Sequence, residues 1–188
     1  MAANGNCPTL KDFILGDDCS ENFGGMATTV YVFKRKDLAA SGLALVSGKE
    51  ATYKLAATPF ESGGRLWKFE CKRESQEVKG ESQGYRKGFI ITATFIIETV
   101  SEDSSVIARA LNTGDLGFIL LDSNGKYQLL FDDTQRCEIE SGGLTTDTGA
   151  AATDDRQMTV NVKLGPVAHP NYFLNAAKAD LDNLAKDS

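Results

Sequence analysis

The chain has 188 residues and a mass of 20.2 kDa, which suits one compact domain or one domain with extended arms. Hydrophobic residues make up 41% of the sequence and charged residues 24%, so a core is expected and wholesale disorder is not. The 20 basic and 26 acidic side chains leave a net charge of −6. This balance argues against a dedicated nucleic-acid-binding protein, which needs a basic face, but not against a protein past which DNA slides.

No apolar run approaches the roughly 18 residues of a membrane-spanning helix, and the first residues lack the basic and apolar stretches of a secretory signal. Histidine, which serves in much acid–base and metal chemistry, occurs once, at His169. We therefore expect no membrane association, no cofactor and no enzyme activity.

The four cysteines, Cys7, Cys19, Cys71 and Cys137, form no CxxC pair and have no short metal-ligand spacing. Without an export signal, reduced thiols are the default state. We predict four free thiols and no metal site. The even number permits two disulfides, but no feature of the sequence selects a pairing.

Residues 1–27 are rich in glycine and contain one apolar island, Phe13–Leu15, so they predict an extended arm with a single anchoring patch. The β-branched and aromatic residues of 28–35 predict a strand. Residues 36–60 are ambiguous, because glycines interrupt a short helical pattern.

Residues 65–73 alternate in polarity, which predicts a strand with one buried face. That face comprises Trp67, Phe69 and Cys71. The charged stretch 74–84 has one apolar residue and predicts a solvated loop or a hairpin tip.

Residues 85–100 predict a strand about twice the usual length of 5–6 residues. Alternate residues from Phe89 to Ile97 share one apolar face, yet Ile90 and Ile96 lie on the opposite face. A strand that is apolar on both faces is covered on both sides, here by the core and by something else.

Residues 101–112 predict a helix that Ser101 caps, with Glu102 and Asp103 at the positive end of its dipole. Gly114 follows the helix and stops it. The predicted apolar stripe comprises Val106, Ile107, Ala110 and Leu111.

Two strands, 115–121 and 126–131, flank a turn with Asn124 and Gly125. Asn-Gly between apolar runs is a strong hairpin signal, and it predicts a turn with both residues at positive φ. The turn also resembles the start of a calcium loop, but Lys126 occupies a ligand position and would repel the ion.

The remaining elements are strands over 136–139 and 157–164, a loop over 141–155, and an amphipathic helix over 171–187. The acid pairs Asp132–Asp133 and Asp154–Asp155 are predicted to lie in solvated turns, because adjacent carboxylates on a strand point in different directions. Together the elements predict a mainly β protein, an antiparallel β-sandwich or barrel with one flanking helix. Its parts are an N-terminal arm (1–27), a β domain (28–165) and a C-terminal helical extension (166–188).

The order of these elements carries a resemblance. The strand TTVYVF follows a glycine-rich arm, RLWKFEC precedes a polar stretch, and GFIITATFIIE precedes the helix SVIARALN. The helix leads to the hairpin GFILLDSNGKYQLLF, and SGGLTTDTGAAATDD leads to the strand QMTVNVKL. This series, over residues 28–165, resembles the tail tube proteins of long-tailed bacteriophages.

The resemblance implies a virion structural protein, assembled in the host cytoplasm, whose rings are usually hexameric and stack into a hollow tail tube. Tube proteins of contractile injection machines and type VI secretion are similar. The implied partners are other copies of the chain, other tail proteins, and DNA that passes through the lumen without sequence-specific binding. The arm and the C-terminal helix lie outside the resemblance, which leaves a tail terminator or a baseplate-proximal ring as alternatives.

A free-standing β-sandwich that binds carbohydrate or protein is a second hypothesis, weakened because the loops 74–84 and 141–155 carry no aromatic side chain. An enzyme that uses carboxylates is the weakest, because the acids do not cluster. For a ring-forming subunit, the candidate contacts lie in the polar stretch, on the outer face of the long strand and in the arm. They are Glu74, Glu77, Lys79, Glu81, Ile90, Ile96, Phe13 and Leu15.

Overall fold

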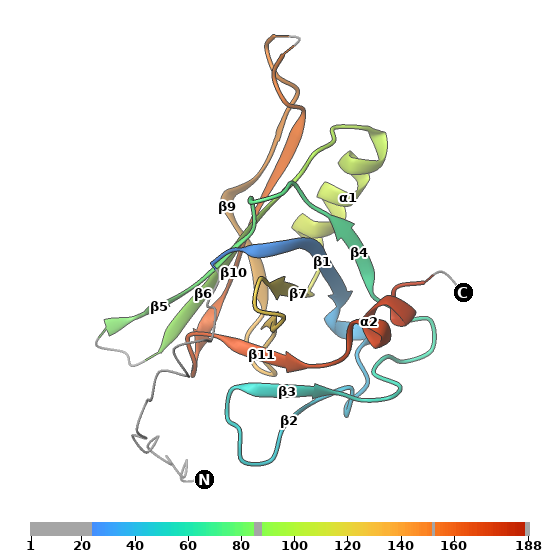
Figure 1. Cartoon of the computed structure of the whole chain (residues 1–188), viewed down its shortest axis with the longest axis vertical. Coiled ribbons are helices and arrows are strands. Elements are labelled where there is room, and N and C mark those ends of the chain that lie inside the picture. The colour runs from blue at the N-terminus through green and yellow to red at the C-terminus, as the bar shows by residue number, and fades with distance from the viewer. Residues whose placement is uncertain (1–23, 85–87, 152, 187–188) are drawn as a thin grey trace.

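The computed structural model of the chain describes residues 24–84, 88–151 and 153–186 (Figure 1). Within them it has eleven strands, two α-helices and a short 3-10 helix, η1 (Arg35–Asp37). The strands are β1 (Met26–Lys34), β2 (Leu43–Leu45), β3 (Thr52–Leu55), β4 (Trp67–Glu70), β5 (Glu77–Ser82), β6 (Phe89–Ile97), β7 (Leu116–Asp122), β8 (Tyr127–Leu130), β9 (Cys137–Asp147), β10 (Gln157–Val167) and β11 (Tyr172–Asn175), and the helices are α1 (Glu102–Thr113) and α2 (Lys178–Leu184).

All eleven strands belong to one sheet in the order β2-β3-β11-β8-β7-β9-β10-β6-β5, and β1 joins it by pairing with β7 on one edge and β4 on the other. The pairs are antiparallel except for β11 with β3. The predicted mainly β fold with flanking helices is confirmed, and the sheet is not closed into a barrel.

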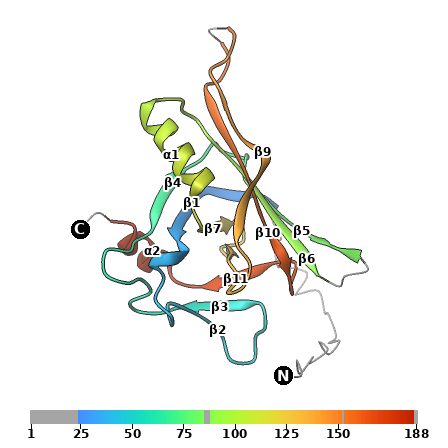
Figure 2. The same cartoon turned by 180° about the vertical axis from the view of Figure 1, so that it is seen from behind.

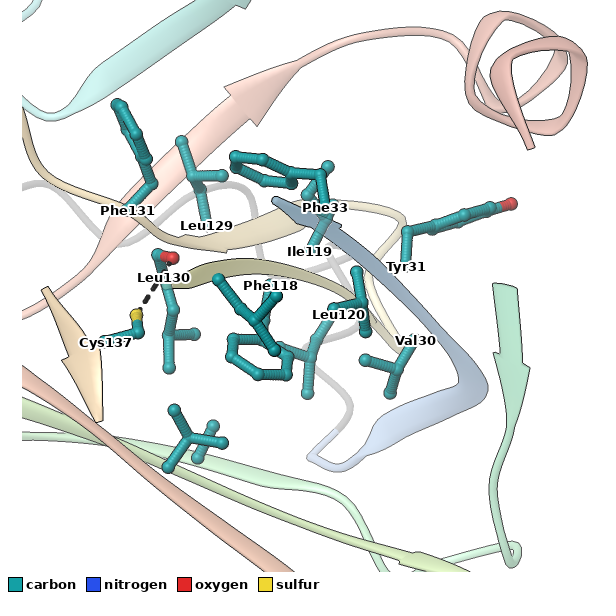
Figure 3. Close-up of a cluster of buried hydrophobic side chains, with 14 of the residues drawn as sticks. Val30, Tyr31, Phe33, Phe118, Ile119, Leu120, Leu129, Leu130, Phe131 and Cys137 are labelled. Carbon is teal, nitrogen blue, oxygen red and sulfur yellow. Dashed lines mark hydrogen bonds between the residues drawn. The ribbon is translucent and has the colours of Figure 1, made fainter. Parts of the chain in front are cut away.

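The core is built around β1, β7 and β8, whose side chains are buried on both faces of the layer that they form (Figure 3). Val30, Phe118 and Leu120 point to one side, and the ring of Phe118 lies 6.0 Å from that of Phe95 on β6. Phe33 points to the other side, over Gly117, where a Cβ would lie only 2.2 Å from the phenyl ring. Gly117 is therefore required by close packing.

The polar stretch expected to be a loop is instead β5, which pairs with β6 from Glu77 to Ser82. At Gly80, the backbone of β5 lies close to the backbone of Pro170, and a Cβ at this position would be 1.9 Å from the Pro170 carbonyl oxygen. Because β5 is a strand through its pairing with β6, its composition alone did not indicate one.

The expected loop 141–155 is also wrong in its first half, because β9 continues to Asp147 opposite Gln157. A bulge separates the pair of Ile139 with Val162 from the pair of Leu144 with Val160. The extra residues return Leu144 to the core side, and they include Gly142 at φ 73°. The bulge interrupts the period of two, so the sequence pattern indicated a loop.

The expected helix 171–187 is wrong over its first residues, which form β11 between β3 and β8. Its buried residues, Tyr172 and Leu174, alternate with Phe173, so the same apolar residues satisfy a strand. Only α2 is helical. Leu181 of α2 is fully buried, and the Tyr31 hydroxyl donates a hydrogen bond to Asp182 Oδ1 of the same helix at 2.7 Å.

Helix α1 begins as predicted, with a capping box. The Ser101 hydroxyl accepts a hydrogen bond from the Ser104 amide, and the Ser104 hydroxyl accepts one from the Ser101 amide. The face that it buries is different from the predicted stripe. Ser104, Ala108 and Leu111 are buried, whereas Val106 is 65% exposed.

The β7–β8 hairpin turns as expected, but only Gly125 has a positive φ, of 76°. The Gly125 amide donates to the Asp122 carbonyl, and Asp122 Oδ1 accepts from the Asn124 and Lys126 amides at 3.0 and 2.7 Å. The loop thus has three residues, a type I turn followed by a glycine bulge, and the prediction for Asn124 is wrong. The Asp122 carboxylate is engaged by the backbone, as a turn requires.

Gly125→Val should lower the free energy of unfolding by about 1–2 kcal/mol, because a β-branched residue resists the left-handed region. No atom lies within 4 Å of a Cβ at this position, so backbone strain alone is responsible. Gly125→Asn, which tolerates this conformation, is the matched control for urea unfolding. Equal stability of the valine and asparagine variants would contradict this turn geometry.

The hydrogen bond from Tyr31 and the ammonium group of Lys68, 3.5 Å away, lower the pKa of Asp182. A lowered carboxyl pKa adds stability above the ordinary value of 3.8, and that stability is lost as the pH falls through the folded value. Tyr31→Phe keeps the ring but removes the donor. Its difference in unfolding free energy from the parent should therefore shrink between about pH 6 and about pH 3, and a constant difference would argue against the pairing.

Cys71 and Cys137 are free, as predicted, and both are buried, as was predicted for Cys71; Cys7 and Cys19 lie outside the described residues. Burial raises the pKa of Cys71 to about 11, and burial followed by the charge of Asp115 raises the pKa of Cys137 further. The Cys137 thiol donates to the Leu130 carbonyl at 3.3 Å (Figure 3).

Both thiols should resist iodoacetamide in the folded protein and react once it is unfolded, because the thiolate is the reacting form. Peptide mass mapping before and after denaturation measures this. Rapid native labelling of Cys71 or Cys137 would contradict the burial.

Candidate assembly surfaces

The strands β5, β6, β10 and β9 form a continuous four-stranded layer with two different faces. Ile91, Ala93 and Phe95 of β6 lie on the core side and are buried. On the other side, Ile90 is opposite Glu81 and Thr92 is opposite Lys79, and opposed residues in an antiparallel pair share a face. The layer therefore separates the core from a mainly polar surface.

This polar face continues across β10 and β9. Lys163 is opposite both Thr92 and Glu138, and Thr94 Oγ1 donates to Asn161 Oδ1 at 2.8 Å. A shallow hollow of about 230 Å³ on the face brings three strands and the bulge together. It is lined by Glu77, Lys79, Thr92, Thr94, Glu140 and Asn161.

Carboxylates outnumber ammonium groups on the polar face. Glu77 and Lys79 form an ion pair at 3.0 Å, with both side chains more than half exposed. Further charged side chains of the face are Glu81, Glu138, Glu140, Asp147 and Lys163. The field over the face is therefore mildly negative.

Both outer strands of the layer have open edges among the described residues. β5 is the last strand in the sheet order, and β9 pairs with β7 at Cys137 alone. The Gln83 amide donates to Gly88, so the alternating antiparallel ladder directs the amides of Val78, Gly80 and Ser82 toward the open edge of β5. Such edges are ready to pair with another chain.

The β9–β10 hairpin projects beyond the body of the protein, as both views show (Figures 1 and 2). Hydrogen bonds from the Ala151 and Ala150 amides to Asp154 shape its end and lower the pKa of that carboxyl. Next to Asp154, Asp155 forms an ion pair with Lys72, which also pairs with Glu98. The acid pair Asp154–Asp155 thus lies in a turn, as predicted.

The other acid pair also lies in a turn. Asp132 Oδ1 accepts hydrogen bonds from the Thr134 hydroxyl and from the Thr134 and Gln135 amides. Burial raises the pKa of Asp132, but these donors outweigh it and the net shift is downward. The Asp132 carboxylate thus holds this turn together, and its Oδ2 accepts a hydrogen bond from the Tyr172 hydroxyl at 3.4 Å.

A second surface is an apolar groove of about 620 Å³ between α1, β4 and the end of β1. Val32 forms its floor, and half-buried Trp67 and Phe69 line one side. Val106 and Ile107 of α1 line the other. Trp67 and Phe69 were expected to pack in the core with Cys71, but of the three only Cys71 is buried.

The structure brings five of the eight candidate contact residues together on the polar face: Glu77, Lys79, Glu81, Ile90 and Ile96. Glu74 lies apart, exposed in the turn before β5 at φ 60°. Phe13 and Leu15 lie outside the described residues. The alternation of β10 and of the predicted strand 136–139 already indicated one polar face, whereas the bulge after Ile139 concealed the contribution of Glu140.

Among the described residues no helix is long and apolar enough to cross a membrane, and no group of three or more His, Cys, Asp and Glu side chains is placed to hold a metal ion. Comparison of the chain with protein-family models, curated proteins and solved structures finds no match.

Proposed function

We propose that the chain is a ring-forming structural subunit whose rings stack into a tail tube through which DNA passes. The observation that carries the proposal is the layer β5-β6-β10-β9. Among the described residues it has an open edge on each side, and no helix or strand packs on its polar face. A heterologous contact between two different edges closes into a ring when the rotation between copies is right.

In the ring, the edge of β5 pairs with the edge of β9 on the next copy. This contact satisfies the outward amides of β5, and it removes the two exposed edges that would otherwise invite aggregation. Repeated around the ring, the pairing makes one continuous sheet whose polar face forms the inner wall. Ile90 and Ile96, half-buried in the single subunit, lie on that face.

The chemistry of this face suits a conduit. A mildly negative wall repels the phosphate backbone, so DNA can move along it without being gripped. The projecting β9–β10 hairpin reaches toward the next ring. In a virion this subunit is a tail protein with no catalytic role.

A non-catalytic binding module is the second candidate, and the observation that favours it is the apolar groove beside Trp67. Aromatic side chains in such grooves stack on carbohydrate or bind peptide. A module of this kind needs no self-association, so oligomeric state separates the two functions.

The tube proposal is tested with Ser82→Pro in the full chain. Proline removes the outward amide of residue 82 and leaves the hydrogen bonds between β5 and β6 intact, so the subunit should fold and fail to form rings. Ser82→Ala is the control. Light scattering after gel filtration, at several concentrations, and negative-stain microscopy measure assembly.

The expected result is rings or tubes for the parent and the alanine variant, and single subunits for the proline variant. A parent that stays monomeric at high concentration would remove the tube proposal and favour the binding module. Normal tubes from Ser82→Pro would show that β5 does not form the ring contact.

A further inference from the structure

Helix α1 carries more apolar surface than its own fold covers. Its buried side consists of Ser104, Ala108 and Leu111, while Val106 is 65% exposed and Ile107 is half-buried. Val106 and Ile107 face the groove toward Trp67 and Phe69. A groove of 620 Å³ has the size of a site for a drug-sized ligand, and so has room for a few large side chains.

Basic side chains gather at one side of the groove, while its one acidic lining residue, Asp115, is paired with Arg136. The ammonium group of Lys34 lies 4.9 Å from the centre of the Trp67 ring, and the guanidinium of Arg65 lies 5.5 Å from it. Lys36 also lines the groove and is exposed. An occupant that fits this surface has apolar side chains for the floor and carboxylates for the rim.

We propose that the groove binds residues 12–18 of a neighbouring copy, and this inference rests on the proposed assembly. That segment reads DFILGDD: three consecutive large apolar residues, Phe13–Leu15, flanked by Asp12 on one side and by Asp17 and Asp18 on the other. Its pattern complements the apolar floor and the basic rim.

The arm of the same subunit is poorly placed to reach its own groove. The chain enters β1 at the opposite end, where the Gly25 carbonyl accepts a hydrogen bond from the Ser123 amide. Val32, beside Trp67, lies eight residues beyond Gly24, and the register shift between Met26 and Val30 makes this path shorter than the about 26 Å of a regular strand. The nine residues from Leu15 to Gly24 span at most about 30 Å.

An arm that returned along β1 would thus use much of its length to reach the groove. Both edges of β1 are already paired, one with β4 and the other with β7. The returning arm would therefore have to cross over a neighbouring strand, which takes up more of its length. A groove on an adjacent copy does not impose this path.

The binding is measured through Trp67, which is the one tryptophan of the chain. The receptor is the full chain with Phe13→Ser and Leu15→Ser, which disables its own arm. The probe is a synthetic peptide of residues 9–21 with Cys19 replaced by serine. Saturable change of the Trp67 fluorescence is expected, and a peptide that also carries the two serines should bind at least about tenfold more weakly.

Val106→Glu in the receptor is the groove variant, and its exposure leaves folding intact. It should weaken binding of the parent peptide by about tenfold or more, because it places a carboxylate against an acidic, apolar ligand. Arg109→Glu, on the same helix and not among the groove-lining residues, is the matched charge control. No fluorescence change, or equal binding to the parent and to Val106→Glu, would overturn the proposal.

Disulfide trapping identifies which copy supplies the arm. One chain carries Leu15→Cys and a differently tagged chain carries Val106→Cys, both with Cys7→Ser and Cys19→Ser. A mixed dimer on oxidation is expected. A disulfide that forms only within one chain carrying both cysteines would overturn the assignment to a neighbour.

Microscopy of the full-chain Val106→Glu variant separates this inference from the proposed tube. Loss of tubes in Val106→Glu, with tubes kept in Arg109→Glu, supports both. Tubes of normal length and stability from Val106→Glu would overturn the groove inference and leave the tube proposal standing. A monomeric parent would remove the tube, and with it the neighbouring arm.

Discussion

The fold depends on the burial of β7 on both faces. Every residue from Leu116 to Leu120 is buried, so neither face of this strand meets water and both need a covering layer. The strands β6 and β10 supply one cover, through contacts such as that between Phe95 and Phe118. On the other side, Phe33 packs directly on Gly117, where there is no room for a side chain. With β1 and β8 as its partners, β7 fixes where the helix before it and the polar layer beside it lie.

Elements with a local cause were predictable from the sequence. The residues that cap α1 lie within one helical turn of each other. The alternation of apolar and polar residues in β6 and β10 indicates which side chains face the core. The elements that were missed have causes elsewhere. β5 is a strand because it pairs with the edge of β6. β11 is a strand because it pairs with β3 on one side and with β8 on the other. In β9, the bulge around Gly142 breaks the period on which the prediction depended.

The candidate surfaces show the same division. Ile90 and Ile96 were recognised because they contradict a one-faced strand, and the register then placed Glu77, Lys79 and Glu81 beside them. The apolar stripe of α1 was counted correctly, but half of it does not face the core. Periodicity reports how many apolar residues a helix presents, and it does not report whose surface covers them. For this chain, the difference between the predicted and the buried stripe is what draws attention to Val106.

The separation of the two surfaces has a physical consequence for the proposed assembly. Exposed ion pairs such as that of Glu77 with Lys79 contribute little, because solvent and salt screen them. The free energy of association must then come from backbone pairing at the strand edges and from burial of apolar groups such as those in the α1–β4 groove. In this proposed assembly the polar face is not needed to hold subunits together, so its charges can face the lumen and the DNA that passes through it. A subunit that bound its neighbours through the polar face could not keep that face both hydrated and negative, and in the proposed assembly the α1–β4 groove supplies a second surface for such contacts.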